Sequence, residues 1–381
     1  MTLALFFTRS VSLETWLMSG LFDREKLLYE AHLINGNLDK VYWFTYGSND
    51  SKLAKKLSEE GQLHSSIIIC EMPWYFNVPI IGTFIYSLFL PLFQYKAIID
   101  SHYLKTNQID GSWSAVFAKW IFQKKLLLRT GYTQSIFLIN ANATVVKVFL
   151  SKLVERFAYF FCDVAIVASI ADRNYIVDKY DLKIEKIEVI PNFVDIEKFK
   201  PSGERNNKKN TLVYVGRLTD QKNLFNLIDA ADLAKLDLDI IGEGELRGEL
   251  ETFASSKKIN INFKGLFSNN DLPNLLNQYR YFILPSNYEG MPKTLIEAMA
   301  CGLVCIGTDI DGINELIEDG VSGFLATQKT SESIFSAINK AVKAQKEQLD
   351  LISGNAKKFI CEKHSLTTIV LSEKEIFDAK S

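Results

Sequence analysis

The sequence predicts an α/β protein built from two doubly wound parallel-sheet domains. Three observations support this prediction: the length of 381 residues, the alternation of strand-like and helix-like runs, and the return of that alternation after residue 210. A chain of this length exceeds one ordinary hydrophobic core and fits two domains of about 100–200 residues each. Strands that alternate with helices are typical of a parallel sheet with crossover helices.

The first half of the chain carries the first set of alternating elements. Short runs of β-branched and aromatic residues predict strands, and longer periodic runs predict helices. The expected strands are 3–7, 41–46, 66–70, 97–99, 126–128 and 164–167, and the expected helices are 21–34, 52–60 and 144–161. A charged stretch at 200–210 predicts a linker to the second domain.

The second half repeats the pattern. The expected strands are 212–215, 238–241, 260–264 and 281–285, and the expected helices are 223–235, 245–256 and 272–278. In doubly wound sheets, ligands bind outside the carboxyl ends of the strands. We therefore expect the two domains to face each other across a cleft that holds the ligand.

Composition excludes several classes of protein. Hydrophobic residues make up 48% and charged residues 23%, so the chain should be folded rather than disordered. A net charge of −2 gives no general attraction to nucleic acid. The scattered cysteines lack zinc-type spacing, and no basic leader precedes the first expected strand. These features predict a cytoplasmic protein with the reduced thiols Cys70, Cys162, Cys301, Cys305 and Cys361.

One apolar segment modifies this picture. Residues 72–95 contain no charged side chain, and the stretch 78–93 is almost wholly apolar. Pro79 and Pro91 interrupt it, so the apolar run is shorter than the roughly 20 residues of a membrane-spanning helix. We expect a buried or membrane-surface helix here, which is compatible with a peripheral contact at the inner face of the plasma membrane.

Two glutamates mark the candidate site. Glu289 and Glu297 stand eight residues apart, the first in a loop after strand 281–285 and the second in a helix that Pro292 begins. One nucleotide sugar could touch both carboxylates, with its ribose at one and its sugar at the other. The alternative is that Glu289 caps the helix and that Glu297 is a solvated helix charge.

The beginning of this helix should attract an anion. The first amides of a helix, here those of Lys293 and Thr294, lack intrahelical partners, and the helix dipole favours negative charge. Arg217 and Lys222 follow another expected strand, from which both could reach a phosphate, or they could be ordinary surface charges. No Asp-x-Asp motif in a comparable position predicts a metal site.

The second half of the sequence resembles the retaining glycosyltransferases with two Rossmann-like domains, the GT-B fold of the glycosyl transferases group 1. Their mark is the Glu-x(7)-Glu motif, which Glu289 and Glu297 match. Further landmarks follow in the family's order, at 191–195, 213–217, 222–223, 240–244, 264–265 and 307–312. Phe193 replaces a glycine of the first landmark.

The resemblance implies roles for these residues and for the domains. Residues 1–193, with a helix at about 365–381 packing back on them, would bind the acceptor, and residues 194–364 would bind the nucleotide sugar. Glu289 would contact the transferred sugar, while Arg217 and Lys222 would stabilise the leaving diphosphate in place of a metal. The implied donor-binding residues are Gly216, Gly290, Met291, Pro292, Lys293, Thr294 and Glu297, with Glu297 on the ribose.

The first half departs from the family pattern on the acceptor side. The stretch 8–16 replaces the usual glycine-rich loop and lacks its paired glycines. The segment 126–132, which ends at Tyr132, occupies the place of a strand-end histidine. His102 could substitute for that histidine, although a lone histidine at a strand end is more often structural.

The resemblance implies transfer of a sugar from a nucleoside diphosphate sugar, without a further cofactor, to a glycan or lipid-linked glycan in cell-surface polysaccharide biosynthesis. An alternative is a non-catalytic homologue that acts as a binding or partner subunit, which the weak motifs of the first half favour. A nicotinamide-dependent enzyme is a third hypothesis, suggested by Gly242, Gly244 and Gly248. This hypothesis ranks lowest for two reasons. Gly248 stands one residue beyond the position that the Gly-x-Gly-x-x-Gly pattern requires, and the expected strand before these glycines is the second of its domain instead of the first.

Overall fold

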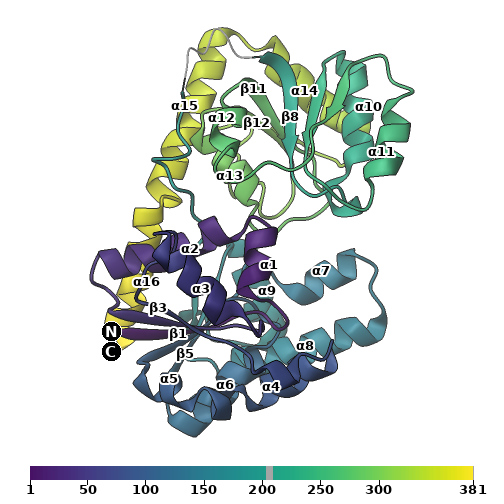
Figure 1. The fold of residues 1–381 in the computed structure, drawn as a ribbon. Helices are drawn as coiled ribbons and strands as arrows, with labels where there is room; N and C mark the ends of the chain where they lie inside the picture. The colour runs from purple at the N-terminus through teal and green to yellow at the C-terminus, as the bar shows by residue number, and fades with distance from the viewer. Residues whose placement is uncertain (203–208, 381) are drawn as a thin grey trace. The chain divides into compact units, whose positions relative to one another are not determined.

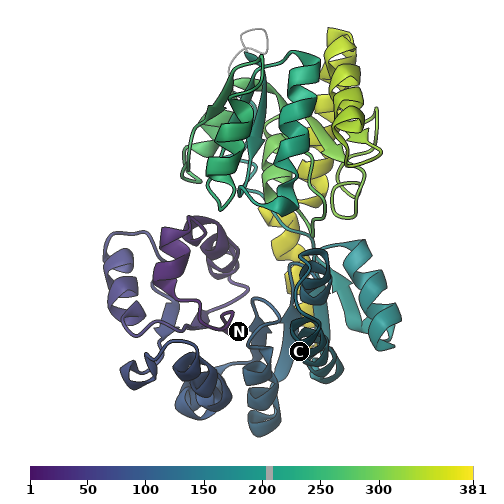
Figure 2. The same cartoon turned by 90° about the vertical axis from the view of Figure 1, so that its right-hand side faces the viewer.

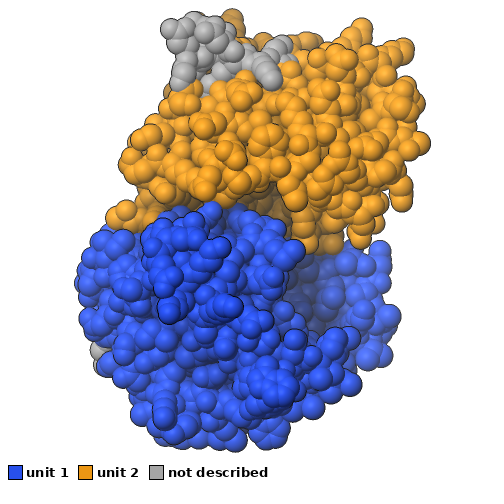
Figure 3. All heavy atoms as spheres, viewed as in Figure 1, with its two compact units in different colours: residues 1–190, 370–381 blue, residues 191–369 orange. Residues whose placement is uncertain are grey.

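A computed structural model describes residues 1–202 and 209–380, which form two compact units (Figures 1 and 3). Unit 1 comprises Met1–Ile190 and Val370–Ser381, and unit 2 comprises Pro191–Ile369. Most of the predicted linker at 200–210 lies outside the described residues. Helix α16 (Leu366–Lys380) contains the residue at which the chain returns to unit 1.

Unit 1 is built on a fully parallel sheet. Among the described residues it has seven strands in the order β3-β2-β1-β4-β5-β6-β7. The strands are β1 (Thr2–Phe6), β2 (Lys40–Phe44), β3 (Ile67–Cys70), β4 (Tyr103–Thr106), β5 (Lys125–Arg129), β6 (Val164–Val167) and β7 (Ile187–Val189). Every residue of the central β1 is buried, as expected for a strand covered on both faces.

Helices connect the strands and cover the sheet of unit 1. They are α1 (Leu13–Met18), α2 (Phe22–Ile34), α3 (Asp50–Glu59), α4 (Ile81–Phe93), α5 (Tyr95–Asp100), α6 (Ser112–Phe122), α7 (Gln134–Asn140), α8 (Val145–Phe161) and α9 (Ile170–Tyr180), with short 3₁₀ turns η1 (Trp74–Phe76) and η2 (Ile184–Lys186). Helices α4, α6 and α8 lie together along the lower side of this unit in Figure 1, with α6 in contact with both others.

The predicted strand at 97–99 is wrong. These residues lie in α5, and the strand that enters the sheet is β4, a few residues later. A short apolar run does not distinguish a helix from a strand by its periodicity. All four residues of β4 are buried, but Lys105 and Thr106 are polar and conceal the strand in the sequence.

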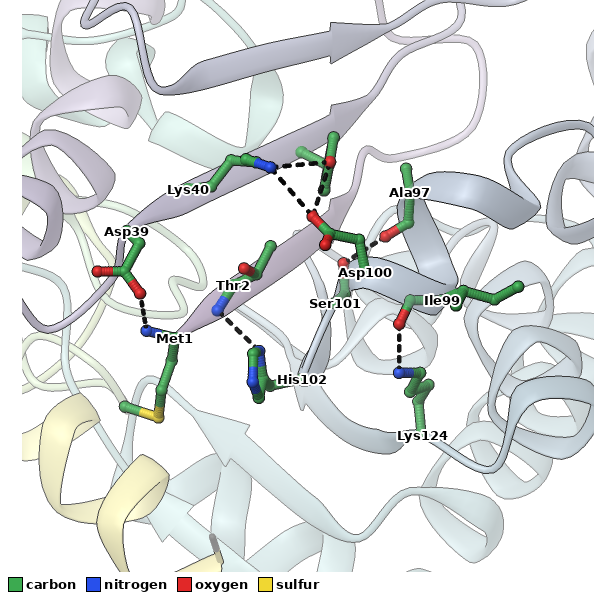
Figure 4. A network of polar contacts seen from close by, with 11 residues as sticks. Met1, Thr2, Asp39, Lys40, Ala97, Ile99, Asp100, Ser101, His102 and Lys124 are labelled. Carbon is green, nitrogen blue, oxygen red and sulfur yellow. Dashed lines mark hydrogen bonds and ion pairs between the residues drawn. The ribbon is translucent and has the colours of Figure 1, made fainter.

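His102 consequently lies at the amino end of β4, opposite the edge where ligands bind in parallel sheets. Its Nδ1 accepts a hydrogen bond from the backbone N–H of Thr2 at 3.0 Å (Figure 4). The ion pairs Met1–Asp39 and Lys40–Asp100 are drawn in the same view. This position supports the structural role of His102 and not the substitution for a strand-end histidine.

The end of the chain is fixed to unit 1 by buried polar contacts. Glu373 of α16 accepts from Lys105 Nζ at 2.5 Å and lies 3.2 Å from His32 Nε2. Tyr103 donates to the Phe377 carbonyl at 2.7 Å. Burial alone would raise the pKa of Glu373, but the Lys105 ammonium and His32 outweigh it and lower this pKa to about 2.

Unit 2 has the same architecture. Its described sheet runs β10-β9-β8-β11-β12-β13, all parallel, with helices on both sides (Figure 2). The strands are β8 (Lys209–Val215), β9 (Leu238–Ile241), β10 (Ile261–Phe263), β11 (Tyr279–Leu284), β12 (Val304–Thr308) and β13 (Phe324–Ala326). The helices are η4 (Asp220–Lys222), α10 (Leu224–Ala234), α11 (Arg247–Ala254), α12 (Leu272–Leu276), α13 (Lys293–Ala300), α14 (Ser331–Lys343) and α15 (Lys346–Lys363).

The strand order of unit 2 reverses at its centre. Strand β8 pairs with β9 on one side and with β11 on the other, so the connections leave these two neighbouring strands in opposite directions. Such a switch point opens a crevice at the carboxyl ends of the two strands, which is where doubly wound sheets bind ligands. The predicted motifs follow β8 and β11.

Candidate active site

Two loops of unit 2 meet at this switch point. One loop, 216–223, follows β8, and the other, 285–292, follows β11. Four hydrogen bonds accepted by backbone carbonyls join the loops: Asn287 N to Gln221 O (2.8 Å), Asn287 Nδ2 to Asp220 O (2.8 Å), Gln221 Nε2 to Tyr288 O (2.9 Å) and Asn223 Nδ2 to Pro285 O (3.1 Å). The backbone of each loop therefore holds the other in place.

This contact brings the predicted residues Lys222 and Glu289 together as an ion pair. Lys222 Nζ donates to Glu289 Oε1, and only 12% of the Lys222 side chain and 7% of the Glu289 side chain are exposed. Ser286 Oγ donates to the same carboxylate oxygen at 2.6 Å, and Gln221 Nε2 lies 3.4 Å from the other. The carboxylate is thus oriented by hydrogen-bond donors from both loops.

Glu289 does not cap the following helix. The residue before α13 is Pro292, and no side chain makes a capping hydrogen bond there. The alternative interpretation of Glu289 as a cap is therefore wrong. Helix α13 begins at Lys293 and Thr294, the two residues whose amides are predicted to attract an anion.

Glu297 lies in α13 one turn beyond its beginning and is only 2% exposed. Its neighbours in the helix from Leu295 to Ala300 are buried as well. The alternative of a solvated surface charge is therefore wrong. A buried acidic residue is unusual enough to indicate a specific role.

The loop between the two glutamates is buried and is held by a hydrogen bond from Asn192. Gly290, Met291 and Pro292 are buried. Asn192 Nδ2 donates to the Met291 carbonyl at 2.7 Å, and His364 Nδ1 donates to the Asn192 carbonyl at 2.9 Å. Burial lowers the pKa of His364.

Glycines allow two close approaches around the site. Gly312 has φ +80°, and a Cβ there would lie 1.8 Å from the Gly290 carbonyl oxygen. Gly242 has φ +138°, and a Cβ there would lie 1.9 Å from the Gly216 carbonyl oxygen. Any side chain at Gly312 or Gly242 would displace a loop that the sequence predicts to bind the donor.

Arg217 is placed differently from Lys222. Its side chain is exposed, and within the described residues its guanidinium makes no hydrogen bond or ion pair. Its backbone carbonyl accepts from Tyr214 Oη at 2.8 Å, which fixes the turn after β8. Burial raises the pKa of Tyr288, and the charge of Arg217 opposes that rise, so this cation acts on the same loop as Glu289.

The two loops thus carry the Lys222–Glu289 ion pair and the exposed cation Arg217, and α13 with the buried Glu297 begins directly after the second loop. Such an arrangement can bind an anion and hydrogen-bond hydroxyl groups at the same time. In residues 1–202 and 209–380, no cluster of three His, Cys, Asp or Glu side chains could hold a metal ion.

The sequence did not identify the supporting residues Gln221, Ser286, Asn287 and His364. Gln221 and Asn287 stand in loops after strands, where a side-chain amide often bonds to a neighbouring backbone. That signal predicts a polar contact but not its partner, because the two loops are more than 60 residues apart in the chain.

Comparison with known proteins agrees with this geometry. Residues 195–359 match the family model described as "Glycosyl transferases group 1". The resemblance predicted from the sequence is confirmed for this part of the chain.

Two curated relatives are informative. A UDP-Gal:alpha-D-GlcNAc-diphosphoundecaprenol alpha-1,3-galactosyltransferase of Escherichia coli is 31% identical over 210 residues, covering 50% of this chain and 54% of the relative. The chain therefore matches about half the length of that relative. An N-acetylgalactosamine-N,N'-diacetylbacillosaminyl-diphospho-undecaprenol 4-alpha-N-acetylgalactosaminyltransferase of Campylobacter jejuni is 28% identical over 259 residues, covering 65% of this chain and 68% of the relative.

Solved structures resemble the chain over its whole length. Anabaena HepE in complex with UDP and glucose has a TM-score of 0.74 at 19% identity, covering 98% of this chain and 99% of that one. Sucrose-phosphate synthase from Thermosynechococcus elongatus has a TM-score of 0.77 at 15% identity, covering 100% and 98%. The predicted fold class, two Rossmann-like doubly wound domains of the GT-B type, is confirmed.

Proposed function

We propose that this protein is a metal-independent retaining glycosyltransferase that moves a sugar from a nucleoside diphosphate sugar to a glycan or lipid-linked glycan acceptor. The observation that carries the proposal is the Lys222–Glu289 ion pair beside the beginning of α13, on the two loops at the switch point of unit 2. The names of the relatives, which transfer sugars to diphosphoundecaprenol-linked acceptors, support this class of acceptor.

In the proposed reaction, the bond between the anomeric carbon and the diphosphate breaks, and negative charge builds on the diphosphate. The diphosphate would lie on the amides of Lys293 and Thr294, with Gly216, Arg217 and Lys222 on its other side. The cations and amides would stabilise the leaving group without a metal ion. The hydrogen bonds that already hold the loop of Lys222 reduce the reorganisation that donor binding requires.

The two glutamates would bind opposite ends of the donor. Glu297 would accept hydrogen bonds from the ribose hydroxyls, and Glu289 would orient the transferred sugar against Gly290, Met291 and Pro292. Because Lys222 and Ser286 both donate to Glu289, the carboxylate is held in one orientation. It would act as an orienting group, with the leaving phosphate available to take the acceptor proton as the configuration is retained.

We propose that the donor and the acceptor bind to different domains. Residues 194–364 would hold the donor, and residues 1–193 together with the helix at about 365–381 would bind the acceptor. A lipid-linked acceptor requires access to a membrane surface, so we place the protein at the cytoplasmic face with a peripheral membrane contact. Within the described residues, no helix has the length and apolar character needed to cross a membrane.

Substitution at the two loops tests the proposal. Glu297→Ala and Lys222→Ala should each lower the rate of sugar transfer by about 10²–10³-fold, as expected when a group that stabilises transition-state charge or donor binding is removed. Circular dichroism should remain unchanged. The matched controls Glu249→Ala and Lys258→Ala remove exposed charges of the same unit and should leave transfer intact. Normal turnover in both site variants would refute the proposal.

A second experiment separates an enzyme from a non-catalytic partner subunit. A panel of nucleotides and nucleotide sugars is tested by thermal shift, because a ligand that binds only the folded state raises the melting temperature. A shift that disappears in Glu297→Ala, accompanied by donor hydrolysis or transfer by the purified chain, supports the enzyme. The complete lack of a shift with every nucleotide would favour the partner subunit.

A further inference from the structure

Helix α4 exposes apolar side chains along one continuous stripe. The exposed residues follow helical spacing and include no polar side chain: Ile81, Phe84, Ile85, Leu88, Phe89, Leu92 and Phe93. Polar atoms point inward instead, where Ser87 Oγ accepts from Trp113 Nε1 at 2.9 Å and the Ser87 carbonyl accepts from Ser114 Oγ at 2.5 Å. The buried side of the helix also carries Tyr86, Leu90 and Pro91, so α4 is apolar on its exposed side as well as on its buried side, unlike an ordinary surface helix.

Helix α8 also exposes apolar side chains, and it buries two polar ones. Its exposed residues include Val145, Val146, Phe149, Leu150 and Leu153. Its buried side carries Ser151 and Glu155. Glu155 accepts from Ser135 N and Oγ, each at 2.7 Å, and from Tyr180 Oη at 2.5 Å. Placing a carboxylate inside and five large apolar side chains outside would be unfavourable if water covered this side of the unit.

Helix α6 connects the two stripes, because it contacts both α4 and α8. Its Trp113 ring lies 6.2 Å from that of Phe84 on α4, and its Trp120 ring lies 4.6 Å from that of Phe161 on α8. Trp120 and Ile121 are themselves exposed. We call the exposed apolar residues of α4 (Ile81–Phe93), α6 (Ser112–Phe122) and α8 (Val145–Phe161) the apolar face of unit 1; Figure 1 labels the three helices.

The charged residues of α8 are mostly cations. On α8 the cations are Lys147, Lys152 and Arg156, and the only acid is the buried Glu155. Single exposed apolar residues are ordinary on a protein surface, whereas a large contiguous patch beside unbalanced cations indicates a specific partner.

We propose that the apolar face of unit 1 inserts into the surface of a bilayer that contains anionic phospholipid, with α8 supplying the cations that select it. Apolar side chains entering the headgroup region beside Lys and Arg are the features of interfacial helices. Aromatic residues near the polar boundary fit this arrangement, and Trp74, Tyr75 and Tyr95 are exposed in the segments before and after α4. The inference rests on the peripheral contact proposed above and extends it from 78–93 to α8.

Vesicle flotation of the full chain tests this inference. The protein should float with vesicles of phosphatidylcholine and phosphatidylglycerol and should bind vesicles of phosphatidylcholine alone at least about tenfold more weakly. Lys147→Gln combined with Lys152→Gln should weaken binding to the mixed vesicles by roughly tenfold or more. Phe89→Ser combined with Phe149→Ser should weaken binding to both kinds of vesicle by a similar factor.

Matched variants in unit 2 provide the controls. Leu233→Ser with Leu351→Ser changes two exposed apolar residues, and Lys258→Gln with Lys343→Gln removes two exposed cations. Neither pair should change flotation. Equal flotation of the wild type and the Phe89/Phe149 variant, or equal binding to both kinds of vesicle, would overturn the inference.

Two further readouts separate the possible causes of failure. Sedimentation of the protein without lipid would reveal a dimer that Phe149→Ser abolishes, in which case a second copy covers the apolar face and the inference is wrong. The nucleotide-induced thermal shift is measured on the same samples. A normal shift without flotation would refute the bilayer contact alone, and flotation without any nucleotide shift or transfer would refute the proposed function alone.

Discussion

Two lysine–carboxylate pairs in this protein have the same chemistry and very different surroundings. Lys105 and Glu373 in unit 1 are 1% and 2% exposed and join β4 to α16. Lys222 and Glu289 in unit 2 are 12% and 7% exposed and join two loops at the carboxyl ends of neighbouring strands. The first pair is covered by a helix of the chain itself, whereas the second lies where a doubly wound sheet binds its ligand. Position, and not the ion pair as such, is therefore the basis for proposing a structural role for the first pair and a functional role for the second.

The largest effect is expected from breaking the pair in unit 1. Lys105→Met leaves the Glu373 carboxylate buried without its main counter-charge, which should lower the free energy of unfolding by about 3–5 kcal/mol. Adding Glu373→Leu should recover most of this loss, because neither member of the pair is then left buried without its partner. Urea unfolding followed by tryptophan fluorescence provides the measurement, since Trp16, Trp43, Trp74, Trp113 and Trp120 all lie in unit 1.

The same experiment sharpens the comparison with unit 2. Lys222→Met should leave the tryptophan-detected transition unchanged while it removes activity, and Lys105→Met should shift that transition strongly. A single Lys105→Met variant as stable as the wild type, or a double variant no more stable than the single one, would contradict the assignment of a structural role to this pair.

A pH dependence of intermediate size follows from Glu373. The pKa of Glu373 is about 2 in the folded protein, against an ordinary value of 4.5. The ionised carboxylate is therefore more stable in the folded state than in the unfolded state. The resulting stabilisation is fully present above pH 4.5 and is lost as the pH falls toward 2. The shift corresponds to roughly 3 kcal/mol.

Unfolding midpoints in urea, followed by tryptophan fluorescence across this pH range, measure the effect. Glu373→Gln should show a shallower loss of stability on acidification than the wild type, because the titrating group is absent. Parallel pH profiles for the two proteins would show that another group causes the acid sensitivity of unit 1.

The two pairs also differ in how far the sequence could predict them. Glu289 and Lys222 follow two expected strands, so motif and spacing alone are enough to locate both residues. Lys105 lies in β4, which its own polar residues conceal, and its partner Glu373 is 268 residues away. The burial of Glu155 in α8 could not be predicted from the sequence for the same reason, because only the fold brings Ser135 and Tyr180 to this carboxylate. Sequence patterns predict elements and local motifs, whereas contacts between distant polar residues depend on the assembled sheet.

The smallest predicted effect concerns the hydrogen bond that orients the functional pair. Ser286 is fully buried, and its Oγ donates to Glu289 Oε1 at 2.6 Å. Ser286→Ala removes this donor with little change in volume while Lys222 still pairs with Glu289, so kcat/KM for sugar transfer should fall by about tenfold, the usual weight of one hydrogen bond to a charged group. Ser353→Ala in α15 removes another buried hydroxyl of unit 2 and should leave transfer unchanged. If the two alanine variants lost activity equally, the orientation of Glu289 by Ser286 would have no part in the reaction, and the Lys222–Glu289 pair would be held by its salt bridge alone.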